Sequence, residues 1–518
     1  MGIPRYLSYI MQRHPEILEL LSKIRPGSRK RVDFLYIDCN SLIYDAVRDG
    51  AGDDDAIYKA VAAKIREHTD LIGPKKGLGI MFDGVAPVAK MEQQRTRRYK
   101  GAFEKELEGK TESGWDTTAI TPGTAFMNGI GPRLRQLLSD VDVPLLVSGP
   151  DEPGEGEHKI FERIRNRSSD HANATTVVYG LDADLIMLTL NHLNVAPRLY
   201  LFRETPHFAR SLNRDLVPNA SYLLDIPALA RSIAEEFRHS APGVKRPDHA
   251  FVSDYILLCF FLGNDFLPHF PSINIRSDGI QMLLDAYKFI TAKGAGPLVE
   301  SGRVKWKNLR ALVSRLADLE RDSIIAQVIQ REKMSRRAHQ LPIHEGSGPA
   351  LNVPLMDRRT EVYIDPERDG WERRYYGSLL ASSDDEARKA AICQNYIEGL
   401  EWTYKYYTTG CIDWDWHYQY NYPPLLADLA KNTPYFDVDV MTSTLAGPVD
   451  PRVQLAYVLP WKSLGLMSDG DVQKLSRAFP EYYTPSHDFE WSFCRYFWEA
   501  HVLFPPVSID KIRSVLSC

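Results

Sequence analysis

The chain has 518 residues, of which 44% are hydrophobic, 25% charged and 11% aromatic. These values are typical of a globular protein with roughly three domains, and they exclude disordered, collagen-like and coiled-coil chains. The 63 Lys and Arg residues against 68 Asp and Glu residues leave a formal charge of −5, which excludes a protein that coats nucleic acid by charge alone. Any nucleic-acid site must therefore be local.

The six cysteines are scattered along the chain without a C-x-x-C pair. This spacing predicts neither a zinc ribbon nor a disulfide framework, and it indicates a reducing compartment. The N-terminal residues lack an apolar signal region, and the longest apolar run, at 255–262, is too short to span a bilayer. We expect a soluble intracellular protein with no membrane partner.

Short β-rich runs alternate with helical stretches from Phe34 to about residue 290, which predicts an α/β fold with a mostly parallel central sheet flanked by helices. The expected strands are Phe34 to Ile37, Leu78 to Phe82, Pro144 to Val147, Thr176 to Tyr179, and Leu199 to Phe202. Three of these strands run directly into an acidic or glycine-rich turn. Because ligands of open α/β sheets bind beyond the carboxyl ends of the strands, we expect the carboxylates of these turns to meet in one crevice.

Seven acidic residues stand at apparent strand ends or in glycine-flanked turns: Asp38, Asp83, Glu155, Glu157, Asp182, Asp184 and Asp265. Any one of them alone could be a helix cap or a turn residue. Seven together would repel one another, so burial without compensation would raise their pKa values. Mg²⁺ prefers oxygen ligands, and two such ions roughly 4 Å apart can activate a water and stabilise the leaving oxygen of a phosphodiester. We therefore expect these seven residues to be catalytic ligands of two Mg²⁺ ions, with Mn²⁺ able to substitute.

A basic stretch follows Asp83. On a helix Lys90, Gln94, Arg97 and Arg98 fall at i, i+4, i+7 and i+8 and share one face. Two forked guanidinium groups, one ammonium and one amide suit a terminal 5′-phosphate. A solvated helix face is the alternative, because the charge run continues beyond this stretch. The position directly after Asp83 favours the 5′-phosphate-binding pocket.

Helical patterns dominate the second half of the chain. An apolar stripe of leucines predicts a helix from Trp306 to about Arg337, and a turn-rich loop follows at 345–349. A further helix is expected from near Ser383, its candidate cap, to Tyr404. The chain is thus expected to comprise an α/β nuclease core at 1–290, a helical insertion and linker at 291–380, and an aromatic-rich second region packing on the core at 381–518.

An aromatic-dense block occupies residues 402–422. Aromatic residues at this density usually form core between helices, because each buries a large area. The alternative is that Trp414 or Trp416 faces Tyr44 and holds a base. His158 lies beside the acids, and we expect it to support them and not to bind metal, since oxygen-rich Mg²⁺ sites rarely use imidazole.

Several longer motifs are more specific than these single residues. They are Met1 to Pro4, Asp83 to Pro87, Ala89 to Met91, Ile120 to Thr124, Pro153 to Lys159, Tyr179 to Leu188, and Gly263 to His269, with weaker ones at Tyr396 to Trp402, at Trp414 and Trp416, and at Gln454 to Pro460. Taken together, they resemble the signatures of the XRN family of 5′→3′ exoribonucleases over most of the chain. The resemblance implies a PIN/FEN-like nuclease core, the seven acids as metal ligands and the basic helix face as the pocket for a 5′-monophosphate.

The activity implied by the resemblance is 5′→3′ degradation of 5′-monophosphorylated single-stranded RNA to mononucleotides by a monomer. Where the family usually has a histidine that stacks on a base, this chain has Tyr44, whose ring can also stack. The chain resembles a catalytic core, and the lack of a paired-cysteine insert favours the cytoplasmic type over the nuclear type. A nuclear or virus-associated setting stays open.

Two other functions remain as alternatives. A structure-specific nuclease on DNA flaps would tolerate a blocked or hydroxyl 5′ terminus, which the exoribonuclease would not. A catalytically silent RNA-binding scaffold would gain nothing from seven carboxylates, because they repel a polyanion.

Overall fold

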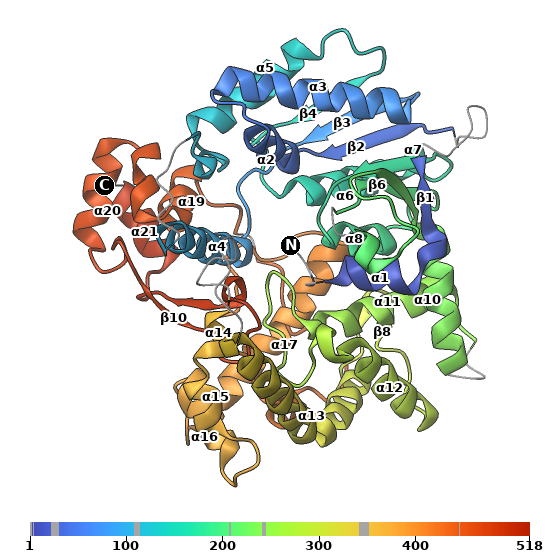
Figure 1. Cartoon of the computed structure of the whole chain (residues 1–518). Helices are drawn as coiled ribbons and strands as arrows, with labels where there is room; N and C mark the ends of the chain where they lie inside the picture. Colours follow the sequence, from blue (N-terminus) through green and yellow to red (C-terminus); the bar gives the residue numbers. More distant parts are fainter. Residues whose placement is uncertain are drawn as a thin grey trace.

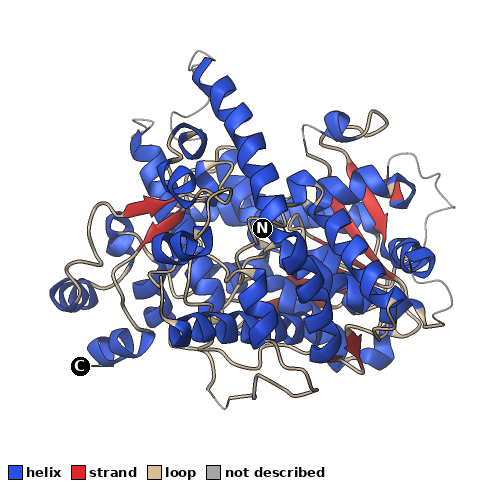
Figure 2. Ribbon diagram, turned by 90° about the horizontal axis from the view of Figure 1, so that it is seen from below, coloured by secondary structure: helices blue, strands red, loops and turns tan. Residues whose placement is uncertain are grey.

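The computed structural model describes residues 3, 5–21, 31–107, 114–206, 209–240, 245–340, 352–444 and 446–517. Helices make up most of the molecule, and the strands lie among them (Figure 2). Within the described ranges, no helix combines the length and the apolar character needed to cross a membrane.

A seven-stranded sheet with the order β1-β7-β6-β5-β2-β3-β4 forms the centre of the N-terminal half. Its strands are β1 (Leu18–Leu20), β2 (Phe34–Asp38), β3 (Gly77–Met81), β4 (Leu145–Ser148), β5 (Thr176–Tyr179), β6 (Leu199–Glu204) and β7 (Ser221–Asp225). The strands from β6 to β4 are parallel, whereas β7 pairs antiparallel with both β6 and the edge strand β1. The predicted α/β class is confirmed, and all the expected strands are present.

The order in which the chain adds strands to the sheet reverses direction at β2. β3 pairs with one edge of β2 and β5 with the other, and the chain crosses from β4 at the sheet edge back to β5. Such a switch point leaves a crevice at the carboxyl ends of the strands. Along β2, Leu35 and Ile37 enter the core cluster on one face of the sheet, and Tyr36 enters the cluster on the other.

Helices cover both faces of the sheet (Figure 1). One face packs against α2 (Asn40–Arg48), α3 (Asp54–Ile72) and α5 (Ala125–Leu137). The other packs against α6 (Gly156–Asn166), α8 (Asp184–Asn191), α10 (Ile226–Ser240) and α11 (Asp248–Cys259), with α1 (Tyr6–Arg13) beside them. The short helices α7 (Ser168–His171) and α9 (Ala209–Leu212) lie in the connections.

Helices also form the middle of the chain: α12 (Gly279–Ala292), α13 (Trp306–Gln340), α14 (Val353–Met356), α15 (Arg359–Ile364), α16 (Trp371–Leu379), α17 (Glu386–Thr408) and α18 (Leu426–Asn432). The predicted helix at Trp306 is confirmed as α13. The predicted cap Ser383 is wrong, because the Asp385 side chain accepts a hydrogen bond from the Arg388 backbone N–H and starts α17 two residues later. The loop expected at 345–349 lies outside the described residues.

The C-terminal part contains α19 (Pro451–Val458), α20 (Asp469–Ala478) and α21 (Ile509–Ser517). Two small antiparallel pairs, β8 (Val299–Glu300) with β9 (Arg303–Val304) and β10 (Asp488–Glu490) with β11 (His501–Leu503), complete the fold. The helix α4 (Val88–Leu107) leaves the sheet and packs against α19 and β11 (Figure 1). The largest core cluster includes residues from Ile3 to Met441, and the division into three parts stays a prediction.

Candidate metal centre and basic helix

Asp38, Asp83 and Glu157 form a compact acidic group. Asp38 ends β2, Asp83 follows β3, and Glu157 lies in the first turn of α6. One carboxylate oxygen of each lies within 4.8 Å of those of the other two. Parallel pairing of β2 with β3 causes this convergence, because it brings the carboxyl ends of both strands to the same edge of the sheet.

The side chains of this group differ in how they are satisfied. Asn40 Nδ2 donates to Asp83 Oδ2 at 2.6 Å, and the Gly156 backbone N–H donates to Asp83 Oδ1 at 2.7 Å. Asp38 Oδ1, in contrast, is buried without a hydrogen-bond partner among the described residues. A buried carboxylate oxygen without a donor is costly unless a cation faces it. The group therefore fits a divalent metal ion bound through oxygen.

A second acidic pair, Glu155 and Asp265, is bridged by Lys90 of α4. The Lys90 Nζ lies 2.5 Å from a Glu155 oxygen and 2.8 Å from a Asp265 oxygen. Burial lowers the pKa of Lys90, but Asp265 and Glu155 outweigh it and raise that pKa well above its ordinary value. The ammonium group consequently stays charged and offsets part of the negative charge.

Two further acids come from the connection after β5: Asp182 lies in the turn before α8, and Asp184 is the first residue of α8. Burial and the neighbouring Asp265 raise the pKa of Asp184 to about 7. Burial likewise raises the pKa values of Asp38 and Glu157, and the surrounding carboxylates add to the effect. All seven predicted acids thus lie close together, and their mutual repulsion calls for cations.

His158 and Tyr406 support the acidic residues. One ring nitrogen of His158 lies within 4.8 Å of carboxylate oxygens of Glu155 and Glu157. Its ring stacks on Tyr406 with centroids 3.7 Å apart, and burial lowers its pKa well below the ordinary value. Tyr406 Oη donates to Glu155 Oε1 at 2.8 Å. α17 therefore positions Glu155, a predicted metal ligand, at the start of α6.

Three of the supporting residues were not singled out as site residues by the sequence analysis: Asn40, Tyr406 and Gln454. Asn40 stands two positions after Asp38, which is the local signal that could have found it. Gln454 Nε2 donates to Gln94 Oε1 at 3.3 Å, and its Oε1 accepts from the Ala86 backbone N–H at 3.1 Å. It fixes the start of α4 from a distant part of the chain.

The predicted basic face lies on α4, but its members differ in environment. Lys90 is engaged with the acids, Gln94 is buried against Gln454, and Arg97 is exposed. Arg98 is partly buried, and its Nη2 donates to the Ile120 carbonyl at 3.3 Å. Its Nη1 is buried without a partner in the described part of the chain, and burial lowers its pKa to about 10. Arg98 therefore remains cationic at neutral pH with one unused donor group.

The three aromatic candidates for base stacking also differ. Tyr44 on α2 is 40% exposed, so its ring does not pack in the core. Trp416 is buried and stacks on Trp402 with centroids 5.1 Å apart. Trp414 is half-buried, and its carbonyl accepts from the Val88 backbone N–H at the start of α4. Most of the aromatic block is buried, as expected for core between helices.

Two family descriptions match the chain. Residues 1–205 match "XRN 5′-3′ exonuclease N-terminus", and residues 248–347 and 362–473 match "Xrn1 helical domain". The 5′-3′ exoribonuclease 1 of Schizosaccharomyces pombe is 26% identical over 99% of this chain and 48% of its own length. The human 5′-3′ exoribonuclease 1 is 28% identical over 100% of this chain and 34% of its own length. The chain therefore spans about half or less of these relatives.

Relatives of a second type and a solved structure also match the chain. Proteins named 5′-3′ exoribonuclease 2 match as well, so the cytoplasmic type stays a prediction. A solved structure of the catalytic core of Rad2 with a DNA substrate covers 69% of this chain and 85% of its own at 15% identity, but its TM-score of 0.33 is too low to support an argument.

All seven acids of the crevice lie within the residues that match the two family descriptions. Asp265 lies within the helical-domain match, and the other six acids lie within the N-terminal match. The two matches together cover most of the chain, which belongs to the XRN family of 5′-3′ exonucleases.

Proposed function

We propose that this chain is a metal-dependent 5′→3′ exoribonuclease that hydrolyses 5′-monophosphorylated single-stranded RNA and releases mononucleotides. The observation that supports this most is the acidic crevice directly beside α4. There Lys90 is paired with Glu155 and Asp265, and Arg98 keeps a buried guanidinium nitrogen that has no partner among the described residues. A terminal phosphate bound by α4 would hold the first phosphodiester near the acids. An internal phosphate carries a nucleotide on both sides and would not fit such a terminal pocket.

Mg²⁺ is the proposed cation, in two positions and replaceable by Mn²⁺. The seven carboxylates would hold it, since oxygen donors suit Mg²⁺ and Asp38 Oδ1 has no other partner in the described residues. When bound, Mg²⁺ would supply an activated water and stabilise the leaving oxygen. Lys90 would offset the remaining negative charge as the RNA approaches.

The other residues of the site would bind and orient the substrate. Arg97 and Arg98 would donate charge-assisted hydrogen bonds to the terminal phosphate, with Gln94 held in place by Gln454. Tyr44, whose ring is exposed, would stack on a base from one side. Trp414 is its proposed partner, because Trp416 is already covered by Trp402.

The experiment that tests this function compares one RNA sequence with three different 5′ ends. The RNA is labelled at its 3′ end and carries a 5′-monophosphate, triphosphate or hydroxyl, and each form is incubated with Mg²⁺ or with EDTA. We expect the monophosphorylated RNA to be degraded at least about ten-fold faster than the others, and only with Mg²⁺.

Each alternative predicts a different result in this experiment. Equal degradation of all three RNAs would contradict the terminal phosphate pocket and favour a structure-specific nuclease. Tight binding without degradation would favour the silent scaffold. Degradation in EDTA would contradict a role for metal.

A further inference from the structure

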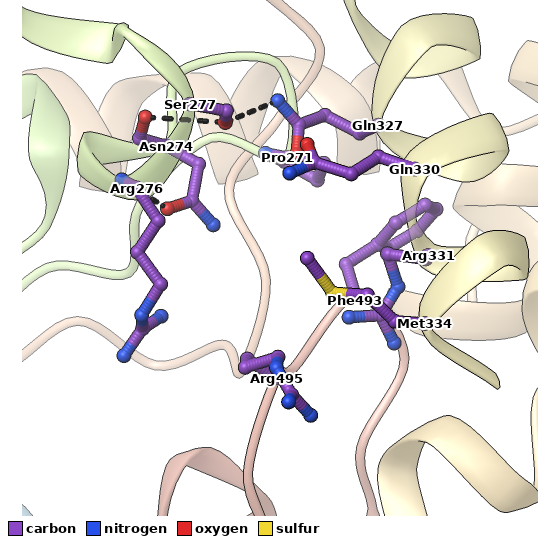
Figure 3. A pocket seen from close by; sticks show the side chains of 10 residues that line it. All are labelled: Pro271, Asn274, Arg276, Ser277, Gln327, Gln330, Arg331, Met334, Phe493 and Arg495. Atoms are coloured by element: carbon purple, nitrogen blue, oxygen red, sulfur yellow. Dashed lines mark hydrogen bonds between the residues drawn. The ribbon is translucent and has the colours of Figure 1, made fainter. Parts of the chain in front are cut away.

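A second basic pocket lies between α13 and the C-terminal segment, apart from the seven acids. The space between its lining side chains is about 420 Å³, a volume that includes open solvent. Arg276, Arg331 and Arg495 line it together with polar and apolar side chains (Figure 3). Both matching family descriptions end before residue 495, so neither covers the C-terminal wall of this pocket.

The charges around this pocket do not balance. Glu361 is shared by Arg331 and Arg358, and Glu499 pairs with Arg276. Among the described residues no carboxylate pairs with the guanidinium of Arg495, whose Nη1 is buried without a hydrogen-bond partner. Glu361 is thus engaged by Arg331 and Arg358, and Glu499 by Arg276 and the Arg495 backbone N–H, so the guanidinium of Arg495 is left to meet an anionic ligand.

The wall of the pocket is held rigidly. Glu361 accepts hydrogen bonds from Arg331 Nε at 3.1 Å and from the Phe493 backbone N–H at 2.8 Å. Arg331 Nη1 donates to the Cys494 carbonyl at 2.7 Å. These bonds fix the backbone immediately before Arg495. The unpaired guanidinium is therefore presented by a preorganised segment, which lowers the entropic cost of binding.

Two stacked aromatic rings border the same basic groups. Tyr496 and Trp498 have centroids 5.7 Å apart and planes inclined by 16°, and Trp498 is 37% exposed. The Arg495 guanidinium lies 4.6 Å from the Tyr496 ring centroid, and that of Arg276 lies 5.5 Å from it. Positive charge beside exposed aromatic faces is the combination with which proteins bind single-stranded nucleic acid.

α4 connects this surface to the metal centre. Lys90 contacts Asp265 near the start of the helix, and Lys100 Nζ donates to the carbonyls of Trp498 at 2.6 Å and Ala500 at 2.9 Å. The ten residues from Lys90 to Lys100 correspond to about 15 Å along a helix axis. A few nucleotides of an extended strand can cover that separation.

We propose that Arg276, Arg495 and Trp498 form a second RNA-binding site. It would hold a backbone phosphate and a base of the same strand whose 5′ nucleotide lies at the metal centre. This inference rests on the proposed function. The exposed Trp498 favours RNA over an acidic peptide, because a base can stack on the ring while its phosphate meets the arginines.

The test measures affinity as a function of RNA length. 5′-Phosphorylated oligouridylates of about 2 to about 16 nucleotides are bound to the full chain in EDTA, with and without Arg495→Gln. For the longest RNA we expect the variant to bind about ten-fold more weakly, since it loses a charge-assisted hydrogen bond. For the shortest RNA, which ends before the pocket, the two affinities should agree within about two-fold.

Matched variants separate a loss at this site from a loss of overall positive charge or of folding. Arg477→Gln removes one exposed positive charge from α20 and should leave the length dependence intact. Trp498→Leu should reproduce the length-dependent loss, and thermal unfolding checks that each variant is folded. A ratio of affinities that is independent of length would overturn the second site. So would loss of polyglutamate binding in Arg495→Gln with unchanged RNA binding, which would identify an acidic protein as the ligand.

The failure of this inference differs from the failure of the proposed function. If the unaltered chain neither binds nor degrades RNA, the proposed function fails. If the unaltered chain degrades monophosphorylated RNA but Arg495→Gln binds RNA of every length as tightly as the unaltered chain does, only the second site is wrong.

Discussion

On α4, Arg98 is the cationic residue best placed to donate a further hydrogen bond to a ligand. One of its guanidinium nitrogens donates to the Ile120 carbonyl, and another is buried with no partner in the part of the chain that the structure describes. Its pKa of about 10 keeps it charged at neutral pH. A charge-assisted bond to a phosphate contributes about 1.5 to 3 kcal/mol. We predict that Arg98→Ala lowers the kcat/KM preference for 5′-monophosphate over 5′-hydroxyl RNA by about ten-fold or more.

Two further variants make this prediction specific. Arg98→Lys keeps the positive charge but lacks the forked donors of guanidinium, so it should retain part of the preference for 5′-monophosphate. Arg97→Ala should also lower that preference. If Arg98→Ala slows both RNAs equally, α4 only follows the RNA backbone and the terminal pocket is wrong.

Tyr44 gives a second test at the scale of a single residue. Its ring is 40% exposed, so its removal should leave the melting temperature almost unchanged. Stacking of a base contributes about 1 to 3 kcal/mol, and Tyr44→Ala should therefore slow single-turnover hydrolysis by roughly ten-fold. Tyr44→His keeps a flat ring and should cost much less. A stably folded Tyr44→Ala protein with an unchanged rate would rule out stacking.

The start of α6 shows how an element positions the predicted metal ligands. Gly156 is the first residue of the helix, and its backbone N–H binds Asp83. A Cβ atom there would stand 2.6 Å from Asp38 Oδ1 and 3.2 Å from the Met81 carbonyl. We predict that Gly156→Ala displaces the Asp38 carboxylate and lowers kcat by about 100-fold.

Gly101 provides a matched control for this substitution. A Cβ at Gly101, within α4, meets no atom within 4 Å. Gly101→Ala should therefore stabilise the protein by about 1 kcal/mol and leave kcat unchanged. Equal activity of Gly156→Ala and Gly101→Ala, measured with the same RNA, would show that the acids are not coupled to the α6 start.

The elements of the sheet could be predicted where apolar runs are long and buried. The five parallel strands follow such runs, but β1 has only three residues and half-buried ends, so its sequence carries no distinct strand pattern. The start of α17 was ambiguous for another reason. Ser383, Asp384 and Asp385 are all good caps, and only the observed hydrogen bond to Arg388 selects Asp385.

The site was predictable to the extent that its residues follow strands. The acids stand directly after β-rich runs or in glycine-flanked turns, and these positions in the sequence predict that they lie close together. Tyr406 and Gln454 could not be found this way. Their partners Glu155 and Gln94 are 251 and 360 positions away, and no local pattern reports such contacts.

At the scale of the whole molecule, the acidic crevice should make stability depend on pH and metal together. Without metal, folding raises the pKa values of Asp38, Glu155 and Glu157, and that of Asp184 to about 7. The folded chain then binds more protons than the unfolded chain between about pH 4 and about pH 7, so this contribution to stability falls as pH rises through that window. Mg²⁺ should restore it by binding the ionised acids.

Thermal unfolding with Mg²⁺ and with EDTA measures this effect. We predict that the difference between the two melting temperatures is small near pH 5 and increases toward about pH 7.5. Other groups titrate in the same range, but they contribute equally with and without Mg²⁺ and cancel in the difference. A difference that is independent of pH would contradict a metal centre made of these carboxylates.

The central claim, that the crevice removes one nucleotide at a time from a 5′ end, is tested most directly with RNA labelled at its 5′-monophosphate. With Mg²⁺ we predict that the label appears as mononucleotide from the first turnover. Asp182→Ala and Asp184→Ala should release none of it while binding the RNA within a few-fold of the unaltered chain, because each loses a proposed metal ligand. Labelled fragments of several nucleotides, or release by Asp184→Ala at a rate within a few-fold of the unaltered chain, would contradict the account.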